Sequence, residues 1–215
     1  MIRRSTPADL PVLQSIWQEI FGDPPAFTER FYKIFGADCA IVAEEDGKVV
    51  GMIHPLPVAL AQNGQYSFGV YIYALATIPG YRGRGIAYAL LRAAESAPFV
   101  SKPTLSGAEA MRLQDISQHT PAFSLLIPGS ESLFSYYRNR GYDRIARVIS
   151  DTSDTYAHHL GLGLSDQPVF LKPEHFFALS ERMWEPVPPP VEQALWKSLS
   201  PDLPNGEPTL SHFMQ

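Results

Sequence analysis

The sequence contains one cysteine, and this scarcity limits covalent and metal-based stabilisation. Cys39 cannot form a disulfide within the chain, and no spacing of Cys and His resembles a zinc site. We therefore expect a reducing, cytoplasmic location and no metal ion. Long apolar runs are also missing: none approaches the roughly 20 residues needed to cross a bilayer, and the N-terminus lacks the apolar stretch of a signal peptide. We expect no membrane association.

Positive charge is also in short supply, which argues against a nucleic-acid partner. The 215 residues include 17 Lys and Arg against 22 Asp and Glu, for a formal net charge of -5. Nucleic-acid binding relies on Lys and Arg that neutralise phosphates. A small molecule or a peptide is therefore the expected partner, bound by a monomer or a homodimer. With 45% hydrophobic residues, the chain can bury the core of one domain with a small appendage.

Helix signals dominate the start of the chain. Thr6, Pro7 and Asp9 form a capping pattern, and apolar residues follow it at helical spacing. A second helix is expected after Pro24-Pro25. The first part is thus predicted to run strand, two helices and then a meander of strands.

Strand signals follow, separated by turns. Asp46-Gly47 and Asn63-Gly64 are strong hairpin dipeptides. Residues 70–78 are apolar at nearly every position, as expected of a central strand covered on both faces. Further strands are predicted at 122–129 and 142–150.

The rest of the chain is predicted to add two helices. The first lies between these last two strands and stops at Gly141, a natural C-terminal cap. Residues 186–190 are too rich in proline for a helix or a central strand, so they predict an extended surface crossing. A short helix is expected around Ala194–Leu199.

Glycine and arginine alternate in Arg82–Ala87, a segment that we term the glycine turn. It follows the apolar strand and leads into residues with helical periodicity. The first N–H groups of a helix lack intrahelical partners and lie at the positive end of its dipole, so this turn suits a phosphate. Gly83 and Gly85 keep side chains away from a ligand, and Arg82 and Arg84 add charged donors. A surface turn with solvated arginines is the alternative.

Other phosphate-binding motifs fit this chain poorly. It has no G-x-x-x-x-G-K-[ST], so a P-loop is not expected. The Gly83-x-Gly85 pattern continues to Tyr88, where a dinucleotide fingerprint needs a small residue.

The glycine turn resembles one family closely. The segment IPGYRGRGIAYALL is similar to the cofactor motif of the GNAT superfamily of N-acetyltransferases, [Q/R]-x-x-G-x-[G/A], with Arg82, Gly85 and Ala87 at its defined positions. MIRRSTPADLPVLQSIW and YYRNRGY also resemble segments of this family, so the resemblance spans roughly Met1 to Ile149. LFSYYRNRGY is similar to the Eis-like branch over a short stretch. The resemblance implies an α/β (α+β) GNAT fold, in which helices flank a central mixed, mostly antiparallel, twisted sheet.

The same resemblance implies a function. The chain would move an acetyl group from acetyl-CoA to a primary amine of a small molecule or peptide, by direct attack in a ternary complex. Tyr137, four residues before Gly141, lies where the family commonly places a tyrosine near the CoA sulfur, and is implied as the general acid. An aromatic core residue is the alternative for it. The implied cofactor-binding residues are Leu75, Ala76 and Thr77 for the pantetheine arm and Arg82, Gly83, Arg84, Gly85, Ile86 and Ala87 for the pyrophosphate.

A general base is harder to assign. Asp and Glu are absent between Gly47 and Ala94, so the strand glutamate of some relatives cannot be carried over. A water chain, backbone carbonyls, Tyr73, His54 or a partly deprotonated substrate are the options, although His54 fits a structural histidine better. The missing carboxylate keeps open a second function, a non-catalytic acyl-CoA sensor or regulatory module. A toxin that acetylates charged tRNA fits poorly with the negative net charge.

Two segments exceed the minimal fold of this family. The connection at 97–122 is longer than usual and could form a lid or a partner surface. Residues 1–150 are expected to form the acyl-CoA-binding and catalytic core. Residues 151–215 are expected to form a C-terminal extension that packs on the core or completes it.

Overall fold

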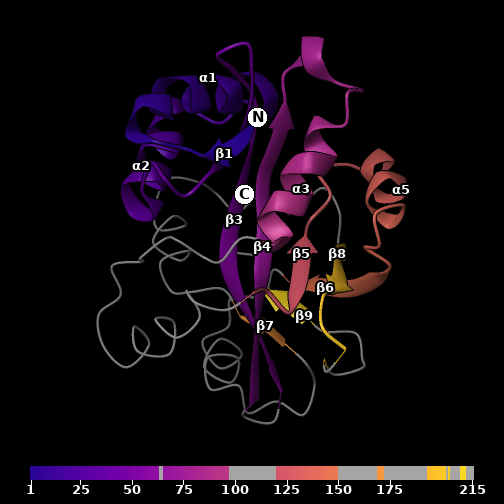
Figure 1. Cartoon of the computed structure of the whole chain (residues 1–215). Helices are drawn as coiled ribbons and strands as arrows, with labels where there is room; N and C mark the ends of the chain where they lie inside the picture. The colour runs from indigo at the N-terminus through magenta and orange to yellow at the C-terminus, as the bar shows by residue number, and fades with distance from the viewer. Residues whose placement is uncertain are drawn as a thin grey trace. The chain divides into compact units, whose positions relative to one another are not determined.

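Two units make up the chain. The structure is a computed structural model that describes residues 1–62, 65–96, 120–149, 169–171, 193–201, 203 and 209–211. Unit 1 comprises Met1–Leu56 and Ile72–Thr120, and unit 2 comprises Pro57–Tyr71 and Pro121–Gln215. The two long neighbouring strands in Figure 1, β3 (Lys48–Gln62) and β4 (Gln65–Thr77), contribute residues to both units.

Unit 1 begins with a short strand and a capped helical turn. The first elements are β1 (Ile2–Arg4), the 3-10 turn η1 (Pro7–Asp9), α1 (Leu10–Phe21) and α2 (Pro25–Phe35). The Asp9 carboxylate accepts hydrogen bonds from the Thr6 N–H at 2.7 Å and from the Thr6 hydroxyl at 2.8 Å. The predicted capping pattern is thus confirmed, but it starts a 3-10 turn from which α1 continues.

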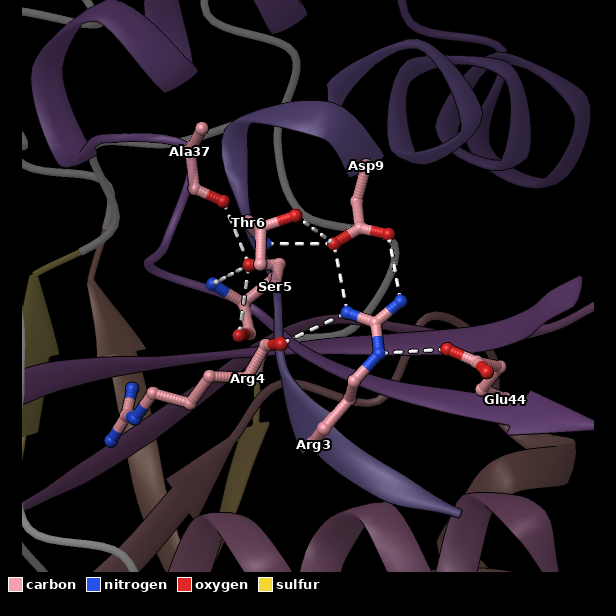
Figure 2. Close-up of polar contacts among 8 residues, drawn as sticks. Arg3, Arg4, Ser5, Thr6, Asp9, Ala37 and Glu44 are labelled. Carbon is pink, nitrogen blue, oxygen red and sulfur yellow. Dashed lines mark hydrogen bonds and ion pairs between the residues drawn. The ribbon is translucent and has the colours of Figure 1, made fainter. Parts of the chain in front are cut away.

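Arg3 ties β1 to both η1 and β2 (Ile41–Glu45). Its guanidinium donates to the two carboxylate oxygens of Asp9 at 2.8 and 2.9 Å, and to the Glu44 carboxylate at 2.7 Å. Figure 2 shows the guanidinium between these two carboxylates. The Arg3 hydrogen bonds hold the pKa of Asp9 well below its usual range. The start of the sheet is therefore fixed by a charged network as well as by strand pairing.

The sheet of unit 1 starts with the predicted hairpin. β2 pairs antiparallel with β1 on one side and with β3 on the other. Asp46 and Gly47 join β2 to β3 with φ angles of 49° and 75°, and a two-residue turn with both centres left-handed is typical of such hairpins. β3 ends at Gln62 and β4 begins at Gln65, so the second hairpin dipeptide lies between them, outside the described residues.

Helix α3 (Ile86–Ser96) packs closely on this sheet because Gly51 has no side chain. A Cβ atom on Gly51 would lie 2.9 Å from the Ala76 carbonyl oxygen and about as close to α3, 3.1 Å from Ile86 and 3.2 Å from Leu90. Trp17 of α1 and Phe31 of α2 pack their rings against His54 of β3. His54 comes three residues after Gly51, so its side chain lies on the opposite face of the strand. In Figure 1 the magenta α3 accordingly lies across the strands from α1 and α2.

The strands of unit 2 form a closed ring of neighbours, because the last strand in the order pairs with the first. The strands are β5 (Phe123–Leu126), β6 (Arg144–Ile149), β7 (Val169–Leu171), β8 (Gln193–Ser198) and β9 (Thr209–Ser211), together with parts of β3 and β4. β4 pairs with β5, β5 with β8, β8 with β6, β6 with β9, β9 with β7, and β7 with β3. β3 neighbours β4 in turn. Parallel and antiparallel pairs are equally common among these six pairings, and the antiparallel pairs β1–β2 and β2–β3 of unit 1 make antiparallel pairing the commoner kind in the described sheet. The predicted mixed, mostly antiparallel sheet is thus confirmed.

The predicted helix around Ala194–Leu199 is wrong, because residues 193–198 form β8. This strand pairs antiparallel with β5 on one side and with β6 on the other. Ala194, Leu195 and Trp196 are all 0% exposed, so successive residues are buried on both faces. A short apolar run of this kind cannot be told from a buried helix by periodicity alone.

The other predictions for unit 2 concern α5 and the tail. Helix α5 (Ser132–Arg138) ends just before Gly141, whose φ of 86° suits the predicted cap. The division into residues 1–150 and 151–215 stays a prediction, although β8 shows that part of the tail completes the sheet of unit 2. Most of the 97–122 connection and all of 186–190 lie outside the described residues.

Candidate functional site

The glycine turn forms an open backbone surface at the start of α3. Gly83 and Gly85 have φ angles of 77° and 81°, which residues with side chains rarely adopt. A Cβ atom at either position would meet nothing within 4 Å. The first helical bond runs from the Ala89 N–H to the Gly85 carbonyl at 3.0 Å, so the preceding N–H groups lie ahead of the helical ladder. These donors can bind an anion from solvent.

The two arginines fasten the turn to neighbouring backbone. Arg82 donates through Nε to the Thr77 carbonyl at 3.0 Å, and Arg84 donates to the Gly80 carbonyl in η2 (Pro79–Tyr81) at 3.2 Å. Arg84 also pairs with Glu45 at 3.4 Å; both side chains are well exposed, so this pair contributes at most about 1 kcal/mol. Both guanidinium groups remain exposed to solvent and carry further N–H donors.

The end of β4 offers a second set of backbone groups. β4 pairs with β5 only at Val70 and Tyr71, and no strand among the described residues pairs with that edge of 72–77. On the β3 side, the Ile78 N–H donates to the Val50 carbonyl at 3.0 Å. Ala76 is buried, Leu75 and Thr77 are partly exposed, and the Thr77 Oγ1 atom is buried without a hydrogen-bond partner in the described part of the chain. An edge of this kind suits an extended ligand with amide groups.

Ala74 has a backbone conformation that the sequence did not signal. Its φ is 44°, in the left-handed region, although it lies inside β4. This conformation is disfavoured for a residue with a side chain by about 1–2 kcal/mol. A glycine at this position would have been a visible signal, whereas alanine gives none. The strained residue directly precedes Leu75–Thr77, the predicted pantetheine segment.

His54 does not suit the role of general base. It is 0% exposed and its Nε2 atom lies 2.9 Å from the Tyr32 hydroxyl. Burial lowers the pKa of His54 to about 3, so the ring is neutral at physiological pH. These contacts confirm the interpretation of His54 as a structural histidine. Tyr73, which is partly exposed, stays a candidate base.

Tyr137 lies in unit 2 on α5. It is 8% exposed and packs edge-on against Tyr136 and Tyr142, with ring centroids 5.1 and 5.8 Å away. Burial raises the pKa of Tyr137, which keeps the phenol protonated. Within the described residues its hydroxyl has no hydrogen-bond partner, whereas that of Tyr142 pairs with Ser124 at 2.6 Å. Tyr137 is therefore a core aromatic residue that also retains a proton to donate.

The predicted cofactor residues come together in unit 1. The Arg82 bond to Thr77 joins the glycine turn to the end of β4, and both segments contact β3 through Gly51 and Val50. Across the part of the chain that is described, no group of His, Cys, Asp and Glu is arranged to hold a metal ion. In the same residues, no helix combines the length and the hydropathy needed to span a bilayer.

The first 97 residues carry the signature of a known family. Residues 1–97 match the family model described as Acetyltransferase (GNAT) domain. The match covers 97 of the 215 residues, so it shows what this part of the chain is similar to. The matched residues include every predicted cofactor residue, from Leu75 to Ala87, and they end just after α3.

Solved structures share the fold of the matched residues and of residues beyond them. The GNAT family N-acetyltransferase YhbS from Escherichia coli, solved in complex with CoA, aligns with a TM-score of 0.52 and 19% identity over 99% of this chain and 88% of YhbS. A GCN5-related N-acetyltransferase from Kribbella flavida aligns with a TM-score of 0.53 and 14% identity over 83% of this chain. One from Anabaena variabilis aligns with a TM-score of 0.50 and 21% identity over 77% of this chain.

These similarities support the predicted fold class. The chain spans only 49% of the Kribbella structure and 43% of the Anabaena structure. At these identities the likeness concerns the fold alone. No curated protein matches the sequence significantly. The similarity to the Eis-like branch stays a prediction.

Proposed function

We propose that the protein is an N-acetyltransferase that moves an acetyl group from acetyl-CoA to a primary amine of a small molecule or a peptide. The observation that carries this proposal is the match of residues 1–97 to the GNAT acetyltransferase domain. The open glycine turn at the start of α3 lies within the matched residues and would supply the anion site that this activity needs.

The residues present fit coenzyme A. The N–H groups from Gly83 to Ala87 would hold the pyrophosphate, with the exposed guanidinium groups of Arg82 and Arg84 beside it. The open edge of Leu75–Thr77 would pair with the amides of the pantetheine arm, and the buried Thr77 hydroxyl would gain a partner, which it lacks among the described residues. That YhbS was solved with CoA supports the same assignment.

The chemistry needs few groups from the chain. Bound acetyl-CoA would supply an activated acetyl group as a thioester. Direct attack forms a bond between the amine nitrogen and the acetyl carbon and breaks the bond between carbon and sulfur, so the amine must lose a proton and the thiolate must gain one. Tyr137, kept protonated by burial, would hold the proton for the thiolate. Backbone N–H groups of β4 would stabilise the negative charge that develops on the acetyl oxygen.

The first test measures the binding of CoA. In titration calorimetry we expect uptake of CoA and acetyl-CoA by the full chain, and at least a tenfold weaker affinity for Gly85→Val, because a β-branched residue disfavours the left-handed φ of Gly85 and covers the turn. Gly80→Ala is the matched control, because a Cβ atom there also meets nothing within 4 Å and Gly80 has no positive φ. No uptake of CoA by the folded protein would overturn the proposal.

The second test measures turnover. Incubation with acetyl-CoA and a panel of amines should release free thiol and give products heavier by one acetyl group. A chain that binds CoA tightly but acetylates none of the amines would favour the sensor or regulatory module. The absence of Asp and Glu between Gly47 and Ala94 is the observation that favours this second function.

A further inference from the structure

We propose that Tyr32 and His54 act as positioning residues that hold Ala74 in its left-handed conformation and so set the course of the strand end that follows. The two side chains lie on α2 and β3, and Ala74 lies on β4. The consequence for coenzyme A rests on the function proposed above; the link between the three residues does not.

The Tyr32–His54 pair is fixed by burial and by rings. Tyr32 is 5% exposed and His54 is 0% exposed, and the Tyr32 hydroxyl lies 2.9 Å from His54 Nε2. The His54 ring also packs against Trp17 at 4.9 Å and Phe31 at 5.2 Å between ring centroids. Closely packed rings on these sides leave the imidazole little freedom to turn.

The strand register brings this ring to the strained residue. The Ile78 N–H donates to the Val50 carbonyl between the neighbouring strands β4 and β3. Four residues along each strand from this bond, and at the irregular position of Ala74, His54 comes beside Tyr73 and Ala74. The backbone groups of Tyr73 and Ala74 accordingly face the imidazole and favour its protonated form, although Nδ1 makes no hydrogen bond of ordinary geometry to the described residues. The contact is therefore mainly one of packing and electrostatics.

Ala74 needs support of this kind. An alanine rarely adopts a φ of 44°, and strained residues persist where their surroundings leave no alternative. A left-handed residue in a strand turns the peptide groups that follow it. The groups that follow Ala74 belong to Leu75–Thr77, the segment whose open edge is proposed to pair with the pantetheine arm. A fixed Ala74 thus presents these groups in one direction.

A rescue experiment tests the link. Tyr32→Phe removes only the hydroxyl group, and we expect it to weaken CoA binding at least fivefold. Ala74→Gly relieves the strain, because glycine adopts positive φ freely, so the double variant Tyr32→Phe/Ala74→Gly should bind CoA within twofold of the wild type. Phe27→Leu perturbs the same ring cluster at a residue that packs on Trp17, with ring centroids 6.0 Å apart, and leaves the contacts of His54 in place. Its loss of stability should not be repaired by Ala74→Gly.

The outcomes separate this inference from the proposed function. The positioning role is wrong if Ala74→Gly leaves Tyr32→Phe unrepaired, or repairs Phe27→Leu equally well. If the wild type binds no CoA, the same comparison is made on the thermal midpoint. Ala74→Gly should then raise the midpoint of Tyr32→Phe more than that of the wild type. Equal shifts in both backgrounds would contradict the positioning role of Tyr32 and His54.

Discussion

Tyr137 combines two properties that are seldom found in one core side chain. It is 8% exposed among aromatic neighbours, yet its hydroxyl has no hydrogen-bond partner among the described residues. A hydroxyl group without a partner in the described part of the chain is available to contact a substrate of the proposed reaction. The aromatic ring alone would serve packing equally well as phenylalanine.

We expect Tyr137→Phe to lower kcat by about 100-fold to 10,000-fold, the range for loss of a general acid, with little change in CoA affinity. Stopped-time assays of thiol release together with calorimetry would measure both quantities. Tyr136→Phe is the control, because this neighbouring tyrosine is half-buried with its ring under the Arg140 guanidinium, 3.5 Å away. Equal losses for the two variants would assign Tyr137 to packing.

At the same scale, individual residues show what sequence could and could not predict. The residues of the glycine turn were predictable because glycine and arginine in alternation have local consequences for backbone and charge. Ala74 and the partnership of Tyr32 with His54 were not, because a strained alanine and a buried contact depend on segments that meet only in the fold. The Thr77 hydroxyl likewise became a candidate contact only once its lack of a partner was visible.

Among the elements of unit 1, the junction of β1, η1 and β2 is held mainly by charge. The Arg3 guanidinium joins Asp9 and Glu44, and the Asp9 side chain is only 10% exposed. The pKa of Asp9 is lowered in the fold, chiefly by the Arg3 hydrogen bonds. Its stabilising contribution is therefore fully present above the ordinary carboxyl pKa and is lost as the pH falls toward the lowered value.

Asp9→Asn should lower the free energy of unfolding by about 1–3 kcal/mol at neutral pH, because it weakens hydrogen bonds to a charged group. The difference from the wild type should shrink below about pH 4, where the unfolded carboxyl takes up its proton. Urea unfolding at a series of pH values measures this, with Glu45→Gln, whose side chain is 37% exposed, as control. A difference that stays constant down to pH 2 would contradict the assignment.

The elements also differ in how well sequence predicted them. The hairpin at Asp46-Gly47 and the helix after Pro24-Pro25 follow from residues that act locally, and both lie where expected. β8 does not, since its partners β5 and β6 lie far away in the sequence. Its apolar residues match either a buried helix or a buried strand, and tertiary pairing decides between them.

At the scale of the whole molecule, the two units share strands. β3 and β4 run without interruption from unit 1 into unit 2. Loss of pairing in one unit removes support from strands that the other also uses. We therefore expect the chain to unfold in one cooperative transition.

A buried charge in unit 2 tests this coupling. Leu195 is 0% exposed and lies between Leu126 and Ile145 of the flanking strands, so Leu195→Asp should lower the unfolding midpoint strongly. The far-ultraviolet signal and the Trp17 fluorescence of unit 1, in a variant without the other tryptophans, should shift together. Leu199→Asp, at a residue that is 36% exposed, should have little effect. Two separate transitions would show that the units unfold independently.

The place of β8 between β5 and β6 has a consequence for biosynthesis. During translation β5 and β6 leave the ribosome long before Gln193–Ser198 is made. Until then, the edge of each strand that pairs with β8 in the fold has no partner strand. Nascent chains with such edges associate readily with one another. Slower elongation ahead of codon 193 would prolong this exposure, and a chaperone that covers the waiting edges would raise the yield of soluble protein.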